Sequence, residues 1–138
     1  MMPELTGVLE TCLHAEDLER AAAFYEDLFG FRKLEGDARF RAFSVADRQV
    51  LLLFQRGATI QPVRIPGGTI PPHDGSGHLH LAFSIPSAEL EAWEKRLAAR
   101  GVSIESKVHW PAGGWSIYFR DPDDHLIELV TPGCWPIY

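Results

Sequence analysis

The sequence predicts an α+β fold made of two tandem β-α-β-β-β modules, which form a cupped, partly open mixed sheet with the helices outside. Three observations support this prediction. Several short runs alternate apolar and polar residues, as half-buried strands do. Two other segments repeat apolar residues at helical spacing. The order strand, helix and three strands then occurs twice, at an offset of about 70 residues, which indicates an internal duplication.

The first module covers residues 5–55. Its first strand is predicted over residues 7–14, where side chains alternate between an apolar and a partly polar face. A helix follows, because Asp17 is a favourable N-cap and Gly30 suits the left-handed position after a helix end. Three short strands complete the module, over residues 31–35, 39–45 and 49–55.

Residues 56–77 are rich in proline and have no sustained period, so we interpret them as a linker and a loop that covers a cavity. The second module, residues 78–131, repeats the pattern. Pro86-Ser87 opens its helix and Gly101 ends it. Its strands are predicted over residues 78–85, 102–108, 115–119 and 125–131. Residues 132–138 form a short aromatic tail that we expect to pack on the body or on a neighbouring subunit.

One face of each sheet is expected to line an interior that binds a ligand. The helix of each module must cover the apolar face, where its own apolar stripe can be buried. The opposite faces then point inward, and they carry many polar groups. In the last strand Glu128 is a single carboxylate among apolar residues, so it needs a partner, a metal ion or the solvent of a cavity. The inward set is Glu10, Cys12, His14, His78, His80, Ser84, Ser116, Tyr118, Arg120 and Glu128.

Two members of this set have less weight as functional residues. We expect Cys12 to be a packing residue and His14, at a strand end, to lie at the surface. Cys12 and Cys134 lie near opposite ends of the chain and form no metal-type cysteine pair, which favours reduced thiols in a cytoplasmic protein.

Composition excludes several partners. The formal net charge of −6 argues against nucleic acid and leaves no basic patch for a membrane surface. No apolar run approaches the roughly 18 residues of a membrane span, and the beginning of the chain lacks the features of a signal peptide. We therefore expect a small-molecule ligand.

Three stretches together resemble a known family. They are the helix D-L-E-R-A-A-A-F-Y-E-D-L-F-G-F, the strand H-L-A-F and the hairpin Y-F-R-D-P-D-x-H-x-I-E-L. With the duplicated layout, they make the chain similar to the vicinal oxygen chelate superfamily, the glyoxalase, bleomycin resistance and dioxygenase family. The resemblance covers nearly all of residues 1–138, as one domain. It also implies a homodimer.

The resemblance implies a metal site built from four strand positions, which fall here at Glu10, Leu52, His80 and Glu128. Three of the four can bind a metal, and the side-chain alternation had already placed those three on inward faces. One histidine and two carboxylates, with water completing the shell, suit Mn²⁺, Fe²⁺, Co²⁺, Ni²⁺ or Zn²⁺.

Two functions stay open. One is a divalent-metal-dependent enzyme of lyase, isomerase or oxygenase type, whose small substrate chelates the metal through two oxygens. His78 or Tyr118 would then be the catalytic base, and Ser116, Tyr118 and Arg120 would contact substrate. Leu52 at the fourth position argues against glyoxalase activity. The alternative is a non-catalytic binding protein of the bleomycin-resistance type. Such a protein would have aromatic and acidic residues in its groove, and the negative charge, Trp110 and Trp115 are compatible with that.

Overall fold

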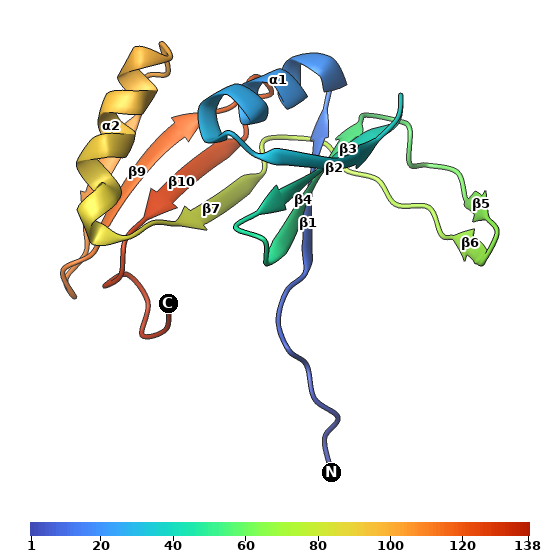
Figure 1. The fold of residues 1–138 in the computed structure, drawn as a ribbon, viewed down its shortest axis with the longest axis horizontal. Helices are drawn as coiled ribbons and strands as arrows, with labels where there is room; N and C mark the ends of the chain where they lie inside the picture. The colour runs from blue at the N-terminus through green and yellow to red at the C-terminus, as the bar shows by residue number, and fades with distance from the viewer. The chain divides into compact units, whose positions relative to one another are not determined.

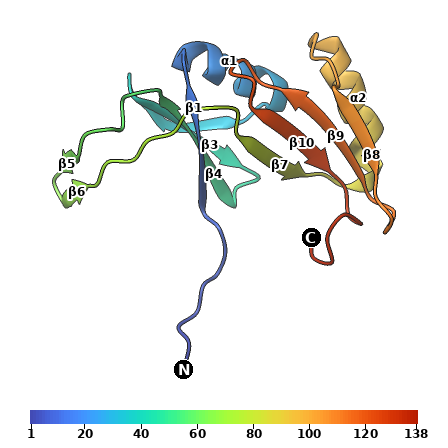
Figure 2. The same ribbon diagram turned by 180° about the vertical axis from the view of Figure 1, so that it is seen from behind.

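The computed structural model describes residues 1–138 and divides into two compact units, Met1–Ser76 and Gly77–Tyr138 (Figures 1 and 2). Each unit has a mixed four-stranded sheet and an α-helix, in the order β-α-β-β-β. The predicted fold class and the internal duplication are therefore confirmed. None of the helices has the length and hydrophobicity that a membrane crossing requires.

The sheet of unit 1 has the strand order β1-β4-β3-β2, in which β1 runs parallel to β4 and the other pairs are antiparallel. Helix α1 begins after Asp17, whose side chain accepts a hydrogen bond from the Arg20 N–H at 3.1 Å, and ends at Gly30 with φ 66°. Both predicted caps are thus present. The elements are β1 (Glu10–Ala15), α1 (Leu18–Phe29), β2 (Arg32–Gly36), β3 (Phe40–Val45), β4 (Gln49–Gln55), β5 (Val63–Ile65) and β6 (Gly68–Ile70).

The core of unit 1 lies between α1 and one face of its sheet. The apolar stripe of the helix is buried there, as its spacing predicts. Its members from helix and sheet are Leu13, Leu18, Ala21, Ala22, Tyr25, Leu28, Phe43, Leu51 and Leu53. Because side chains alternate along a strand, the other face of the same sheet is left for Glu10, Cys12 and Leu52.

The proline-rich segment contains a small hairpin that the sequence pattern does not reveal. Strands β5 and β6 pair with each other only, and they project away from the four-stranded sheet of unit 1 (Figure 1). Thr59 anchors the base of this segment. Its buried hydroxyl donates to the His73 carbonyl at 2.6 Å, and the His73 N–H donates to the Thr59 carbonyl at 2.9 Å.

Unit 2 repeats the topology, with strand order β7-β10-β9-β8 and a parallel β7–β10 pair. Strand β8 starts later than predicted, because the chain after α2 first bonds back to the helix through Val102 N–H and the Leu97 carbonyl at 2.9 Å. The elements are β7 (His80–Ser84), η1 (Ser87–Glu89), α2 (Leu90–Ala99), β8 (Ser106–His109), β9 (Trp115–Arg120) and β10 (Leu126–Val130).

The hairpin of β9 and β10 has the alternation that the sequence predicts. Ile117, Phe119, Ile127 and Leu129 are buried on one face of the sheet, at 0–1% exposure. Glu128 lies on the opposite face, next to Tyr118 in the register. The tail folds back on its own unit, because the Tyr138 hydroxyl donates to the Ile85 carbonyl.

Candidate functional site

His80 and Glu128 lie together on the open face of the unit 2 sheet. They come from the neighbouring parallel strands β7 and β10, in which His80 is aligned with Leu126. The His80 Nε2 and Glu128 Oε1 atoms are 3.2 Å apart. The carboxylate is nearly buried, with 9% of its side chain exposed, whereas half of the His80 side chain is exposed. Two of the three predicted metal ligands are therefore adjacent.

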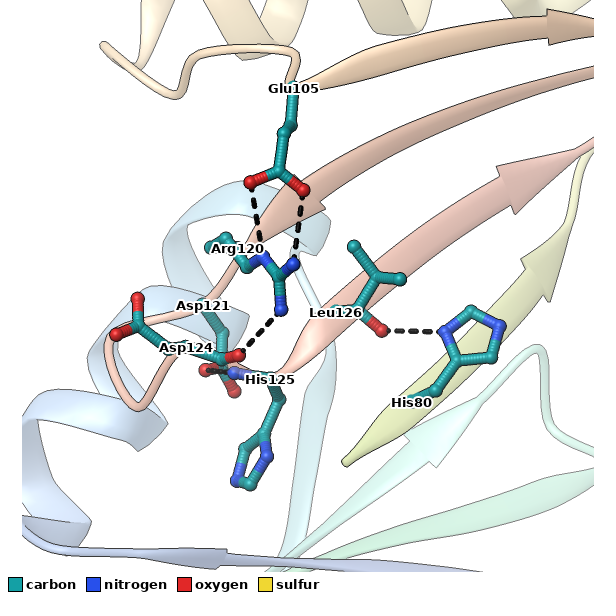
Figure 3. Close-up of polar contacts among 7 residues, drawn as sticks. All are labelled: His80, Glu105, Arg120, Asp121, Asp124, His125 and Leu126. Atoms are coloured by element: carbon teal, nitrogen blue, oxygen red, sulfur yellow. Dashed lines mark hydrogen bonds and ion pairs between the residues drawn. The ribbon is translucent and has the colours of Figure 1, made fainter. Parts of the chain in front are cut away.

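Main-chain contacts orient the His80 ring. Its Nδ1 lies 2.8 Å from the Leu126 carbonyl oxygen (Figure 3). A carbonyl can only accept, so Nδ1 carries the proton and donates. Nε2 is then the atom that faces Glu128. Two hydrogen bonds fix the chain before His80: Leu126 N–H donates to the Leu79 carbonyl at 2.8 Å, and Leu79 N–H donates to His125 Nδ1 at 2.9 Å.

The second oxygen of Glu128 is held by a short chain of hydrogen bonds. Ser116 is fully buried, and its hydroxyl donates to Glu128 Oε2 at 2.5 Å. The Trp110 Nε1–H donates to the same Ser116 oxygen at 2.8 Å. Both carboxylate oxygens of Glu128 are thus placed, one toward Ser116 and the other toward His80.

Tyr118 borders this pair. It is aligned with Glu128 in the β9–β10 register, and its ring centroid is 6.3 Å from that of His80. Burial, and then the negative charge of Glu128, raise the pKa of the Tyr118 hydroxyl above its ordinary value. The hydroxyl therefore keeps its proton at neutral pH and acts as a hydrogen-bond donor.

Arg120 and His78, also predicted as site residues, are placed differently. The Arg120 guanidinium donates two hydrogen bonds to the Glu105 carboxylate, at 3.4 and 3.1 Å, and a third to the Asp124 carbonyl at 3.0 Å (Figure 3). Its donors are thus used at the end of the hairpin. His78 is exposed in the segment that precedes β7.

The sheet face of unit 1 borders a cavity of ≈ 890 Å³. Glu10, Cys12 and His14 of β1 line it, as the side-chain alternation predicts, and Leu52 of β4 lines it too. Burial, followed by the charge of Glu10, raises the pKa of the Cys12 thiol. The thiol is therefore protonated at neutral pH. The remaining walls include Leu34, Arg39, Phe40, Val50, Phe54, Ile70, His73 and Asp74.

The prediction that His14 lies at the surface is wrong, because this residue is 6% exposed. Its ring stacks on Phe54, with centroids 5.8 Å apart, and meets the edge of His73 at 5.7 Å. Gly75 lies so close that a Cβ atom there would overlap the imidazole. The return of the proline-rich segment to the sheet thus covers His14, and it also forms a wall of the cavity.

The donors present suit a divalent transition-metal ion. An imidazole nitrogen and a carboxylate oxygen converge in unit 2, and both are ligand types that Mn²⁺, Fe²⁺, Co²⁺, Ni²⁺ and Zn²⁺ accept. A lone pair on Nε2 would repel Glu128 Oε1 at this distance unless a cation, either a proton or a metal ion, is shared between them. Neither unit by itself brings three His, Cys, Asp or Glu side chains into a group that could hold a metal ion. The third predicted ligand, Glu10, belongs to unit 1.

Sequence reasoning named Trp110 only for the alternative binding function and did not assign it to the metal site. The signal was available, because Trp110 follows β8 at the same parity as Ser106 and Val108, which are aligned with Tyr118 and Ser116. That parity places the indole on the face that carries Glu128. The role of the Leu126 main chain had no signal in the side-chain pattern, since any residue supplies a carbonyl.

Comparison with known proteins gives one family. The family model described as the glyoxalase/bleomycin resistance protein/dioxygenase superfamily matches residues 7–129. A metallothiol transferase FosB from Bacillus licheniformis is 30% identical over 129 residues, which cover 93% of this chain and 77% of that protein.

Solved structures give the same result. A lactoylglutathione lyase from Agrobacterium tumefaciens aligns with a TM-score of 0.88 and 31% identity, over 98% of this chain and 100% of that one. The fosfomycin resistance protein FosX from Listeria monocytogenes aligns with a TM-score of 0.63 and 26% identity, over 95% of this chain and 94% of that one.

Proposed function

Because the chain belongs to the glyoxalase/bleomycin resistance protein/dioxygenase superfamily, we propose that it is a divalent-metal-dependent enzyme acting on a small substrate with two neighbouring oxygens. The observation that carries this proposal is the convergence of His80 Nε2 and Glu128 Oε1 at 3.2 Å. The names of its relatives support it, since metallothiol transferase and lactoylglutathione lyase both denote enzymes.

Three side chains would hold the ion: His80 and Glu128 from unit 2, and Glu10 from unit 1. Leu52, which occupies the fourth position of the family pattern, supplies no ligand and leaves room for substrate oxygens or water. When bound, such an ion is a Lewis acid that stabilises negative charge developing on the substrate oxygens.

The protein groups around the pair would position the substrate. Tyr118 can donate its hydroxyl hydrogen to a substrate oxygen from the strand beside Glu128. His78, exposed before β7, is the candidate for moving a proton to or from solvent. Arg120 is a weaker candidate for substrate contact, because Glu105 already occupies its guanidinium. Within this proposal, the enzyme is of lyase, isomerase or oxygenase type.

The assembly and location follow as part of the proposal. A homodimer would let Glu10 meet His80 and Glu128 either within one chain or across two, as the family resemblance implies. Cys12 and Cys134 are both free thiols, which fits the reducing conditions of the cytoplasm.

The unit 1 cavity favours a second candidate, a binding protein that sequesters a small molecule without catalysis. A volume of ≈ 890 Å³ is enough for a drug-sized ligand, and aromatic and aliphatic residues such as Phe40, Phe54 and Leu52 form much of its wall. Glu10, Glu35 and Asp74 would favour a cationic ligand there.

Metal analysis distinguishes the two candidates. Protein purified without chelator is equilibrated with Mn²⁺, Fe²⁺, Co²⁺, Ni²⁺ or Zn²⁺, desalted and measured by elemental analysis. We expect about one ion per chain, as in a single mononuclear site. His80→Ala should abolish retention, because it removes the nitrogen ligand, whereas the control His78→Ala should keep it. Equal metal content in wild type and His80→Ala would contradict the metal site and favour sequestration.

A further inference from the structure

We propose that Trp110 and Ser116 are positioning residues, which hold the Glu128 carboxylate in the orientation that a metal ligand requires. The inference rests on the proposed metal function, and it names two residues that act on the ion only through Glu128.

The direction of each hydrogen bond in this chain is fixed by chemistry. An indole N–H can only donate, so the Ser116 oxygen must accept from Trp110. The single hydroxyl proton of Ser116 is directed to Glu128 Oε2, at 2.5 Å. While Oε2 of Glu128 accepts from Ser116, its other oxygen, Oε1, lies on the side of His80, 3.2 Å from Nε2.

Trp110 is itself fixed by the turn between β8 and β9. The main-chain N–H of Trp110 donates to the Gly114 carbonyl at 2.8 Å, and the Gly113 N–H donates to the Trp110 carbonyl at 2.9 Å. Gly113 has φ 99°, a conformation that favours glycine. The Gly114 N–H then donates to the Gly133 carbonyl at 3.1 Å, which ties the turn to the segment after β10. The main chain that carries the indole is thus held by the turn, and the indole N–H is held by the Ser116 oxygen.

Burial makes these hydrogen bonds effective. Ser116 is 0% exposed and Glu128 7%, so water has little access to replace the serine hydroxyl. Groups that orient a metal ligand in this way typically contribute about 10–100-fold to metal affinity. The sequence predicts that Ser116 contacts substrate; the proposal gives it a positioning role instead, because its hydroxyl proton is directed to Glu128.

The test measures Co²⁺ affinity of the full chain by isothermal titration and by the absorption spectrum of the bound ion. Ser116→Ala removes the donor to Glu128, and Trp110→Phe removes the donor to Ser116 while keeping an aromatic ring. Trp115→Phe is the matched control: its ring stacks on His109, with centroids 4.1 Å apart, and Lys107 lies over it. Circular dichroism and thermal unfolding check that each variant is folded.

We expect Ser116→Ala to weaken Co²⁺ binding by about 10–100-fold, Trp110→Phe to weaken it less, and Trp115→Phe to leave it unchanged. Because Trp110 acts through Ser116, the double variant Trp110→Phe/Ser116→Ala should bind no more weakly than Ser116→Ala alone. A merely structural role for Trp110 would instead give additive losses, and it would not alter the Co²⁺ spectrum.

A measurement without metal tests the hydrogen bonds directly. The indole N–H resonance that disappears in Trp110→Phe identifies Trp110 among the four tryptophans, and Ser116→Ala should shift it and speed its hydrogen exchange. Wild-type Co²⁺ affinity in folded Ser116→Ala, or an unmoved indole resonance, overturns the inference and leaves the proposed function intact. Absence of Co²⁺ binding by wild type overturns both.

Discussion

At the scale of single residues, His125 joins the β9–β10 turn, in which it is buried, to the segment before β7. Its Nδ1 accepts from the Leu79 N–H at 2.9 Å, immediately before β7. Its own N–H donates to Asp121 Oδ1 at 3.0 Å, which shapes the turn (Figure 3). The residue is 2% exposed, so its hydrogen bond to Leu79 does not compete with bulk water.

Replacing His125 tests how much the acceptor Nδ1 contributes to the stability of the protein. His125→Leu leaves the Leu79 N–H without its partner, and the free energy of unfolding should fall by about 1–3 kcal/mol. His125→Asn places an amide oxygen near the former Nδ1 position and should lose less. Urea unfolding of both variants measures the difference. If the two lose the same free energy, packing rather than the hydrogen bond explains the position.

At the scale of elements, the β8–β9 turn and the segment after β10 meet backbone against backbone. Gly114 is buried, and a Cβ atom there would lie 2.6 Å from the Gly133 carbonyl carbon and 2.7 Å from the Pro132 oxygen. Neither neighbour is a flexible side chain, so a substitution must move the main chain of one segment.

Gly114→Ala should therefore destabilise the protein by about 1–3 kcal/mol, in the range of overpacked interiors. Gly67→Ala is the matched control, because Gly67 lies between β5 and β6 with open space where the Cβ would be. Its stability should stay close to that of wild type. Thermal unfolding gives both values, and a loss for Gly67→Ala equal to that for Gly114→Ala would contradict the steric explanation.

The elements also show what the sequence could predict. Alternation located the longer strands and their faces, because one face of each is covered by a helix. It missed β5 and β6, which have three residues each and no helix against them. His14 was misplaced because its cover comes from Gly75, far along the chain. Such contacts depend on the path of a loop, which no local period specifies.

For the candidate site too, side-chain alternation predicted which residues share a face but not the contacts that they make. Side-chain parity placed His80 and Glu128 on one face, and the family resemblance selected them as ligands. Parity did not reveal that the Leu126 carbonyl orients the imidazole, or that Ser116 gives its proton to Glu128. Those roles depend on hydrogen-bond directions that only three-dimensional contacts define.

At the scale of the whole molecule, the proposed ligands come from both units. Glu10 belongs to unit 1, and His80 and Glu128 to unit 2. In a homodimer, the proposed site would be built either within one chain or from unit 1 of one chain and unit 2 of its partner. The two arrangements behave differently when inactive variants are mixed.

Glu10→Gln and Glu128→Gln are each expected to lose metal, because each lacks one carboxylate ligand. When the two variants are unfolded and refolded together, a site shared between chains would regain both carboxylates at about one site in four. A site within one chain would regain none. Elemental analysis of the mixture decides, with separately refolded variants as controls. Strong metal binding by Glu10→Gln alone would contradict the role of Glu10.

The parallel pairing of β7 with β10 has a consequence for the order in which unit 2 folds. Strands β8, β9 and β10 follow one another through short turns, so Glu128, Ser116 and Trp110 can assemble from a local meander. His80 joins only after closure of a long loop, since its contact with Leu126 spans 46 residues. Contacts of that separation form slowly. During refolding the carboxylate should therefore be in place before the imidazole reaches it, and the ability to retain a metal ion should be acquired in the last kinetic phase.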